Sequence, residues 1–386
     1  MTSTDFHVCI GTIASKYEAL MKENADLRAE IALLKAQLNV SQNEARPRRR
    51  KSSSGERLSD KKRQSSSFWQ MKQKLKIDWN LIPVEFSDSL LCVNVGYDNN
   101  IAFGSIDAAI YVYSTTENRL ITKVLGHQGA INCITAHPKA GIYASCSGDS
   151  MINIWSPQPL NNLMTRSDYQ VISTIYANTT LSGHNGPVTS ACWLDAEGHL
   201  ISGSQDGVLL MWDVLQSKNS YRSESLKSPI RSVDVQYDTD MPIAVGTASG
   251  EITLIDSKSP DSKSTLTHGN GSIVQVKYAT TSNAKNFLIS GNSDEKINVW
   301  DLRSPNIPFE TVDINRVCTK FTVHGDNVVI PCEIGKMRIL NLLSMQYSII
   351  ESTPFSYTVS EVNFVNDNTI VAASWDGSAA MGRIDI

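Results

Sequence analysis

The sequence lacks the patterns that mark most secreted and membrane proteins. Its seven cysteines are scattered, and no two of them form a CxxC pair. This usage fits a reducing compartment, in which a thiol acts as a small apolar side chain, and it predicts no disulfide framework. No apolar run approaches the roughly 18–20 residues of a membrane-spanning helix. No apolar segment follows an N-terminal basic one, so we expect no signal peptide.

Enzymatic motifs are missing as well. The chain has no glycine-rich phosphate loop, no GxSxG elbow, no HExxH helix and no kinase-like set of motifs. We therefore expect a protein that is not an enzyme and that uses no cofactor and no metal ion. We expect it in the cytoplasm, the nucleus or both.

Three segments share a strand–turn–strand pattern. They are Ser145–Ser156 (SCSGDSMINIWS), Leu200–Val214 (LISGSQDGVLLMWDV) and Ser290–Leu302 (SGNSDEKINVWDL). In each segment an Asp in a predicted turn lies six residues before a Trp. The Asp-Gly step of the second segment is a strong hairpin signal, because Gly tolerates a positive φ and Asp can bond nearby backbone.

Weaker copies of the pattern extend it along the chain. The position of the Trp is occupied in order by Tyr113, Trp155, Trp212, Ile255, Trp300, Leu340 and Gly382. Most intervals between them are about 40–45 residues, a period typical of four-stranded propeller blades. The single longer interval contains a polar insertion over 157–177, which we interpret as a loop between blades.

A Gly-His pair precedes two of the strong repeats, as Gly126-His127 and Gly183-His184, and Thr267-His268 is a weaker copy. With these motifs the chain resembles the WD40 β-propeller family. The resemblance implies an all-β fold of seven blades over residues 77–386. The last strand, Ala379–Ile386, then needs an outer neighbour, and we expect Leu81–Phe86 to supply it and close the ring.

The resemblance also implies a hydrogen-bonded tetrad in each strong repeat. The implied sets are His127–Ser145–Asp149–Trp155, His184–Ser202–Asp206–Trp212 and His268–Ser290–Asp294–Trp300. The three sets belong to different blades and cannot converge on one substrate. We therefore interpret them as structural rather than catalytic or metal-binding.

In propellers of this family the residue before each turn Asp is exposed on the face that binds partners. The resemblance places Ile106, Gly148, Gln205, Ser293 and Trp375 at these positions. Trp375 has two interpretations: an aromatic anchor for a partner, or a side chain that folds over a neighbouring loop.

Residues 6–39 carry a heptad pattern. Positions a and d are occupied by Ile10, Ile13, Tyr17, Leu20, Asn24, Leu27, Ile31, Leu34 and Leu38. A buried Asn at an a position favours a defined register. Glu23 and Glu30 at g would face Arg28 and Lys35 at e of a parallel partner. We predict a coiled coil that forms a homodimer; a single helix that packs on the propeller is the alternative.

Residues 40–76 are rich in Ser, Arg, Lys and Gln, which predicts a disordered linker. Between residues 41 and 76, twelve Lys or Arg face three Asp or Glu. Two basic clusters, Arg48, Arg49, Arg50 and Lys51, then Lys61, Lys62 and Arg63, resemble a bipartite nuclear-import signal. A lipid contact and a plain tether stay open, and nucleic-acid binding is disfavoured because no aromatic residue is interleaved. Ser52 and Ser65 follow basic residues and are candidate phosphorylation sites.

The segment Tyr17–Leu34 (YEALMKENADLRAEIALL), ahead of a basic Ser-rich stretch and a propeller, is similar to the WD-repeat-containing protein 37 family. That resemblance implies an adaptor that binds a phosphofurin acidic cluster sorting protein. Two other functions stay open. One is a substrate-recognition subunit of a ubiquitin ligase, for which we find no F-box or ligase-docking motif. The other is a coiled-coil scaffold of vesicles or autophagy.

Overall fold

A computed structural model describes residues 70–157, 173–237, 239–260, 262–267, 269, 271–280, 286–314, 319–333, 336–344 and 346–384. These residues form β-strands and no helix, and they lie within one compact unit, Ser65–Ile386. The predicted coiled coil, both basic clusters, Ser52 and Ser65 lie outside the described residues.

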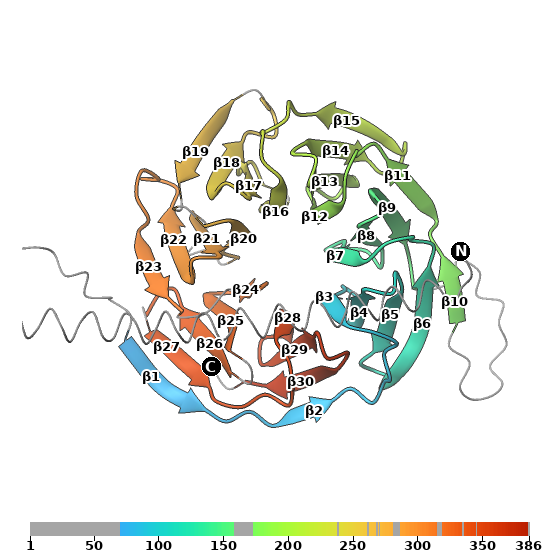
Figure 1. The fold of residues 1–386 in the computed structure, drawn as a ribbon, viewed down its shortest axis with the longest axis vertical. Helices are drawn as coiled ribbons and strands as arrows, with labels where there is room; N and C mark the ends of the chain where they lie inside the picture. The colour runs from blue at the N-terminus through green and yellow to red at the C-terminus, as the bar shows by residue number, and fades with distance from the viewer. Residues whose placement is uncertain are drawn as a thin grey trace, which may run out of the picture. The chain divides into compact units, whose positions relative to one another are not determined.

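The strands form seven sheets arranged as blades around a ring (Figure 1), and all strand pairs within them are antiparallel except β1–β27 and β6–β10. This confirms the prediction of a seven-bladed all-β propeller. Three blades contain four consecutive strands each: blade three has β12 (Val188–Trp193), β13 (His199–Ser204), β14 (Leu209–Asp213) and β15 (Lys218–Arg222); blade four has β16 (Ile230–Asp234), β17 (Ile243–Thr247), β18 (Glu251–Ile255) and β19 (Lys263–Thr267); blade five has β20 (Ile273–Tyr278), β21 (Phe287–Asn292), β22 (Lys296–Asp301) and β23 (Glu310–Asp313).

The other four blades include strands from elsewhere in the chain. Blade one has β3 (Leu90–Val95), β4 (Asn100–Ser105), β5 (Ile110–Ser114), β6 (Arg119–Leu125) and β10 (Ser173–Tyr176); blade two has β7 (Ile131–Ala136), β8 (Tyr143–Ser147), β9 (Met151–Trp155) and β11 (Thr179–Ser182); blade six has β24 (Thr322–His324), β25 (Asn327–Glu333), β26 (Lys336–Asn341), β27 (Gln346–Ile350) and β1 (Gln70–Leu75); blade seven has β28 (Val359–Asn366), β29 (Thr369–Ser374), β30 (Ala379–Arg383) and β2 (Trp79–Leu81). All seven positions predicted from the Trp repeat fall on the third strand of a blade.

The polar insertion differs from our prediction of a loop between blades. It lies inside blade two, between β9 and β11, and its described end forms β10. This strand pairs in parallel with β6 of blade one, where Ser173 Oγ and Thr122 Oγ1 are 2.9 Å apart. The insertion therefore adds a fifth strand to blade one before the chain returns to complete blade two.

Ring closure also differs in its residues from the prediction. The N-terminal part of the propeller does supply the outer strand of blade seven, but β2 pairs with β30 through Trp79, Asn80 and Leu81, so only the first residue of the predicted segment 81–86 belongs to this strand. Trp79 packs edge-on against Phe355 and donates its indole N–H to the Ser352 carbonyl at 3.0 Å. With these contacts the closing strand begins at Trp79 rather than at Leu81, and Pro83 lies outside any strand.

An additional strand precedes the closing one. β1 pairs in parallel with β27, so it lies in blade six, and Lys74 forms an ion pair with Glu351 at 2.5 Å. The segment 70–75 was predicted to belong to the linker. The strands of the propeller therefore include residues before the predicted boundary at residue 77. In Figure 1, β1 and β2 lie along the outside of the strands from the C-terminal end.

The core consists of seven apolar clusters, one at each interface between neighbouring blades. A close approach between blades depends on glycine at one position of the second strand. A Cβ built on Gly203 would lie 2.4 Å from Ile230 Cγ2 of the next blade, and one on Gly246 would lie equally close to Ile273 Cγ2. At these two positions the small residue allows the first isoleucine of the following blade to pack closely on its neighbour.

Candidate protein-interaction surface

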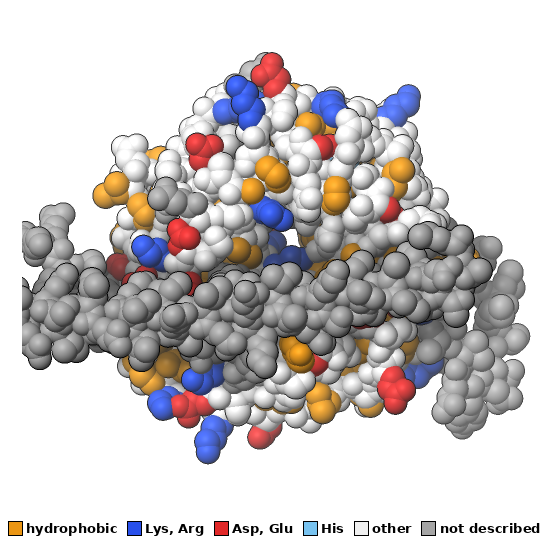
Figure 2. Space-filling view, in the orientation of Figure 1, with side chains coloured by type: hydrophobic (Ala, Val, Ile, Leu, Met, Phe, Trp, Pro, Cys, Tyr) orange, Lys and Arg blue, Asp and Glu red, His pale blue; other side chains and the backbone are white. Residues whose placement is uncertain are grey.

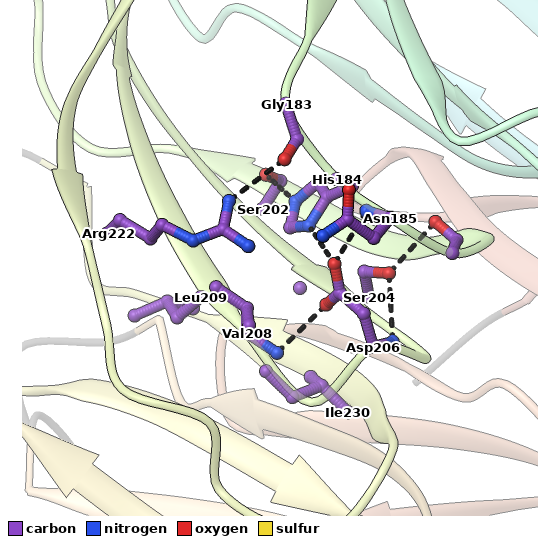
Figure 3. Close-up of polar contacts among 12 residues, drawn as sticks. Gly183, His184, Asn185, Ser202, Ser204, Asp206, Val208, Leu209, Arg222 and Ile230 are labelled. Carbon is purple, nitrogen blue, oxygen red and sulfur yellow. Dashed lines mark hydrogen bonds and ion pairs between the residues drawn. The ribbon is translucent and has the colours of Figure 1, made fainter.

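Blade three contains the full polar set that the sequence predicts (Figure 3). His184 Nε2 lies 2.8 Å from Ser202 Oγ, and its Nδ1 lies 3.3 Å from Asp206 Oδ2. The indole of Trp212 donates to the same Ser202 hydroxyl at 2.8 Å. The carboxylate also accepts from the backbone N–H groups of Asn185 and Val208. Asp206 thus ties the loop that enters the blade to the turn between β13 and β14.

The protonation of this set follows from its surroundings. Burial raises the pKa of Asp206, but the backbone N–H groups of Asn185 and Val208 outweigh burial and lower it. Burial lowers the pKa of His184, so the ring is neutral near pH 7. An ionised carboxylate can only accept, so Nδ1 carries the proton and Nε2 accepts from the Ser202 hydroxyl. Every polar atom is then satisfied, and no general base is exposed to a substrate.

Blade two repeats this geometry. His127 lies 2.9 Å from both Ser145 Oγ and Asp149 Oδ2, and Trp155 donates to Ser145 at 3.2 Å. Burial raises the pKa of Asp149, and the backbone N–H groups of Gln128 and Met151 outweigh it, so the pKa is lowered.

Blade five carries part of the set. Trp300 donates to Ser290 at 2.8 Å, as in the other two blades. A Cβ built on Gly271 would lie 2.5 Å from the Asp294 carboxylate, which places that carboxylate against the loop that enters the blade. His268 lies outside the described residues.

Blades one and seven hold the turn Asp by other residues, which sequence reasoning missed. In blade seven, Ser356 donates its N–H and its hydroxyl to Asp376 Oδ2 at 2.8 and 2.9 Å. In blade one, the Tyr111 hydroxyl donates to Asp107 Oδ2 at 2.9 Å. The spacing along the chain could have indicated Ser356 as the partner of Asp376, since it lies 20 residues before Asp376 and each His lies 22 residues before its Asp.

Burial raises the pKa of Asp376, but hydrogen bonds from Ser378, Ser356 and Ser374 outweigh it and lower this pKa to about 2. The carboxylate is therefore ionised near neutral pH. It holds the turn that carries Trp375 without a histidine.

The residues before the turns, Ile106, Gly148, Gln205, Ser293 and Trp375, are all exposed. Trp375 and Ile106 are the large apolar ones, at 42% and 48% exposure. Tyr357 lies in the loop that enters blade seven and is 58% exposed, and the carbonyl of the next residue, Thr358, accepts from the Trp375 N–H at 3.2 Å. Ser89 joins the two turns: its hydroxyl donates to the Trp375 carbonyl at 2.7 Å, and its carbonyl accepts from Ile106 N–H at 3.1 Å. We call Ile106, Tyr357 and Trp375 the rim patch.

The centre of the ring holds a cavity of about 500 Å³. Its wall comes from the innermost strands and includes Arg231, Lys277 and Lys320. Figure 2 shows basic side chains beside the hollow at the centre of one face, with scattered charges of both signs around it. Two of the basic residues are paired: Lys277 lies 2.9 Å from Asp234, and Lys320 lies 3.5 Å from Glu361.

Comparison with known families matches the two blades with complete polar sets. Residues 118–156 and 176–213 match the family described as WD domain, G-beta repeat. The chain contains WD40 repeats. The matched segments end directly after Trp155 and Trp212, and the turns with substituted polar partners, at Asp107 and Asp376, lie outside them.

Curated relatives carry the name "Ribosome biogenesis protein WDR12 homolog". The protein of Drosophila virilis is 26% identical over 56% of this chain and 54% of its own length, and that of Aedes aegypti is 27% identical over 48% and 45%. The chain thus spans about half the length of these relatives. They are not the protein 37 family to which the N-terminal segment is similar, and that segment lies outside the described residues.

A solved structure described as "Structure of U3-55K" shares the fold. It has a TM-score of 0.66 and 15% identity, and the match covers 80% of this chain and 98% of the other. At this identity the similarity extends to the propeller and no further. Among the described residues, no helix has the length and apolar character needed to cross a membrane.

Proposed function

We propose that this chain is a non-enzymatic scaffold whose WD40 propeller binds a partner protein through the rim patch. The observation that carries the proposal is the exposure of Trp375 and Ile106 on turns joined by Ser89, with the exposed Tyr357 in the loop that enters blade seven. Aromatic residues on a rigid support are typical of binding hot spots. The polar sets support the same conclusion, because their histidines are satisfied internally and offer no chemistry.

The identity of the partner has two sources of support. The N-terminal segment is similar to a family that binds a phosphofurin acidic cluster sorting protein, and the curated relatives are named for ribosome biogenesis. We propose the sorting protein as the partner, in an assembly in which the predicted coiled coil makes a homodimer. A ribosome-assembly partner in the nucleus is the second candidate, and the ubiquitin-ligase and vesicle-scaffold functions are further outcomes of the test.

Quantitative affinity purification of the full chain tests the proposal. We expect Trp375→Ala to reduce recovery of the partner by at least about 10-fold, as expected for the loss of a hot spot. Tyr97→Ala is the matched control, because Tyr97 is 69% exposed on the turn at the opposite end of blade one. Equal recovery with Trp375→Ala and wild type would reject the rim patch as the binding site.

The proteins recovered with the wild-type chain distinguish the partners. A sorting protein in near-stoichiometric amount supports the adaptor, ribosome-assembly factors support the second candidate, and cullin subunits support the ligase. Light scattering tests the dimer separately. We expect the full chain to be a dimer at tens of micromolar, and the double substitution Leu20→Lys and Leu27→Lys to make it a monomer.

A further inference from the structure

Blade two has a pair of cysteines at a register position where four other blades have a glycine on the second strand. In the register between the first and second strands, Cys133 of β7 is opposite Cys146 of β8. At the same register position, four other blades have a glycine on the second strand: Gly104, Gly203, Gly246 and Gly291. Cys146 therefore occupies the position that glycine holds at those four blade interfaces. Its partner on the first strand, Cys133, is also a cysteine.

The backbone of this pair suits a disulfide. Residues directly opposite in antiparallel strands have Cα atoms about 4.5–5.5 Å apart, within the range of about 4.4–6.8 Å that disulfides span. In blade one the residue equivalent to Cys133 is Cys92, whose strand partner is Gly104. Its side chain points toward that partner, since a Cβ built on Gly104 would lie 2.5 Å from Cys92 Sγ. In blade two the equivalent Cβ exists, and it carries a sulfur atom.

Cys133 is also accessible. It lines the central cavity and is half-buried, whereas Cys146 is fully buried in the cluster between blades two and three. A small oxidant in the cavity therefore reaches Cys133 first, and Cys146 lies behind it as a resolving thiol.

The charges around Cys133 favour its thiolate. A hydrogen bond from the Cys146 thiol lowers the pKa of Cys133 to about 6, against the effect of burial, and the Lys320 ammonium also lowers it. Lys320 crosses the cavity to donate to the Asn132 carbonyl at 2.5 Å, next to Cys133 in the chain. Glu361, which pairs with Lys320, opposes this effect more weakly. The pKa of Cys146 is raised by the same pairing, so it keeps its proton.

We propose that Cys133 and Cys146 form a reversible disulfide across blade two when a peroxide enters the central cavity. The Cys133 thiolate attacks one oxygen of hydrogen peroxide, the O–O bond breaks, and a sulfenic acid and hydroxide form. The Cys146 sulfur then attacks the Cys133 sulfur, water leaves with the thiol proton, and the S–S bond forms. Two sulfur atoms are oxidised by one peroxide, and a dithiol reductant reverses the step by exchange.

Intact-mass and peptide mass spectrometry of the full chain test this proposal. After brief treatment with hydrogen peroxide, we expect the loss of two hydrogen atoms and a peptide pair linked through Cys133 and Cys146. Cys146→Ser should abolish the linkage and leave Cys133 as a sulfenic acid that a dimedone probe traps. Cys133→Ser should show neither product.

Cys192→Ser is the matched control. Cys192 lines the same cavity, but its strand partner is Ile201 and burial raises its pKa. This variant should form the disulfide as the wild type does. Native alkylation with iodoacetamide should modify Cys133 at a rate that no longer rises above pH about 7, because the thiol is already ionised there.

Three results would overturn the proposal. The first is a disulfide that persists in Cys146→Ser, and the second is oxidation of Cys133 to sulfinic acid in the wild type without any linkage. The third is alkylation of Cys133 no faster than that of Cys192 at pH 7. Circular dichroism of each variant, taken before oxidation, identifies a substitution that has only disrupted folding.

Discussion

Blades two and three differ from blades one and seven in how they hold the same turn. In the first pair a buried histidine links the turn Asp to the Ser–Trp pair of the blade core. In the second pair a serine or tyrosine hydroxyl bonds the Asp, and the Trp position is occupied by Tyr113 or Gly382. The carboxylate and the turn are retained in both, so the turn is the part that the fold needs.

The difference has a physical reason. A turn Asp that accepts from two backbone N–H groups already satisfies those two donors of the loop. One hydroxyl donor is then enough to satisfy the remaining acceptor capacity of the carboxylate. The histidine adds a connection from the turn to the core. We therefore expect the stability of blades two and three to depend on their polar sets more strongly than that of blades one and seven.

The largest expected effect is on the buried tryptophan of blade three. Trp212 is 2% exposed and packs in the cluster between blades two and three. We expect Trp212→Ala to lower the free energy of unfolding by about 3–5 kcal/mol, measured by urea denaturation. Trp375→Ala, at an exposed site, should change it by less than about 0.5 kcal/mol. Similar values for the two variants would remove the distinction between core and rim tryptophans.

A smaller loss is expected from the histidine. His184→Ala leaves the Ser202 hydroxyl and one Asp206 interaction unmatched in a buried site, which costs about 1–3 kcal/mol of unfolding free energy. Ser356→Ala in blade seven is the comparison, because its backbone N–H still reaches Asp376. Its cost should be the lower of the two. If Ser356→Ala proves as costly as His184→Ala, the two kinds of blade are equivalent.

The free energy of unfolding should depend on His184 of blade three and on Asp376 of blade seven in different pH ranges. The folded-state pKa of His184 is lowered, so its contribution is complete above about pH 6.5, the value for an unfolded chain, and is lost as pH falls. The folded-state pKa of Asp376 is about 2, so its contribution is complete above about pH 4 and is lost between about pH 4 and 2.

Thermal midpoints measured from pH 7 to pH 2 separate these ranges. His184→Gln should flatten the curve below about pH 6.5, and it should also raise the pKa of Asp206, which His184 helps to lower. Ser356→Ala should narrow the acidic pH range over which the thermal midpoint falls, because the loss of the Ser356 hydroxyl raises the pKa of Asp376 toward its value in the unfolded chain. A curve that is the same for both variants and the wild type would show that neither group carries the pH dependence.

The smallest effect is a gain in blade four. Ser249 occupies the position of the turn Asp, and its N–H donates to Ser228 Oγ at 3.0 Å. Ser249→Asp introduces an acceptor opposite the loop that enters the blade. We expect it to raise the unfolding free energy by up to about 1 kcal/mol. Ser293→Asp, on a turn that already has Asp294, is the control and should give no gain.

The repeat predicted the blades well because its signals are local. A turn Asp and the residue six positions later lie within one hairpin, so spacing alone places the third strand even where the Trp is replaced, as at Tyr113 or Gly382. The polar partners of blades one and seven were missed because Tyr111 and Ser356 differ in residue type from the histidine that the pattern seeks.

The sequence by itself determined the number of blades, the position of each third strand and the spacing of the polar sets in blades two and three. The tertiary structure alone decided which early residues close the ring, that β10 pairs with blade one, and that Cys133 lies opposite Cys146 beside the cavity. These pairings join residues that are distant in the chain or depend on strand register. No local pattern records them, because they are selected by the fit of whole blades around the ring.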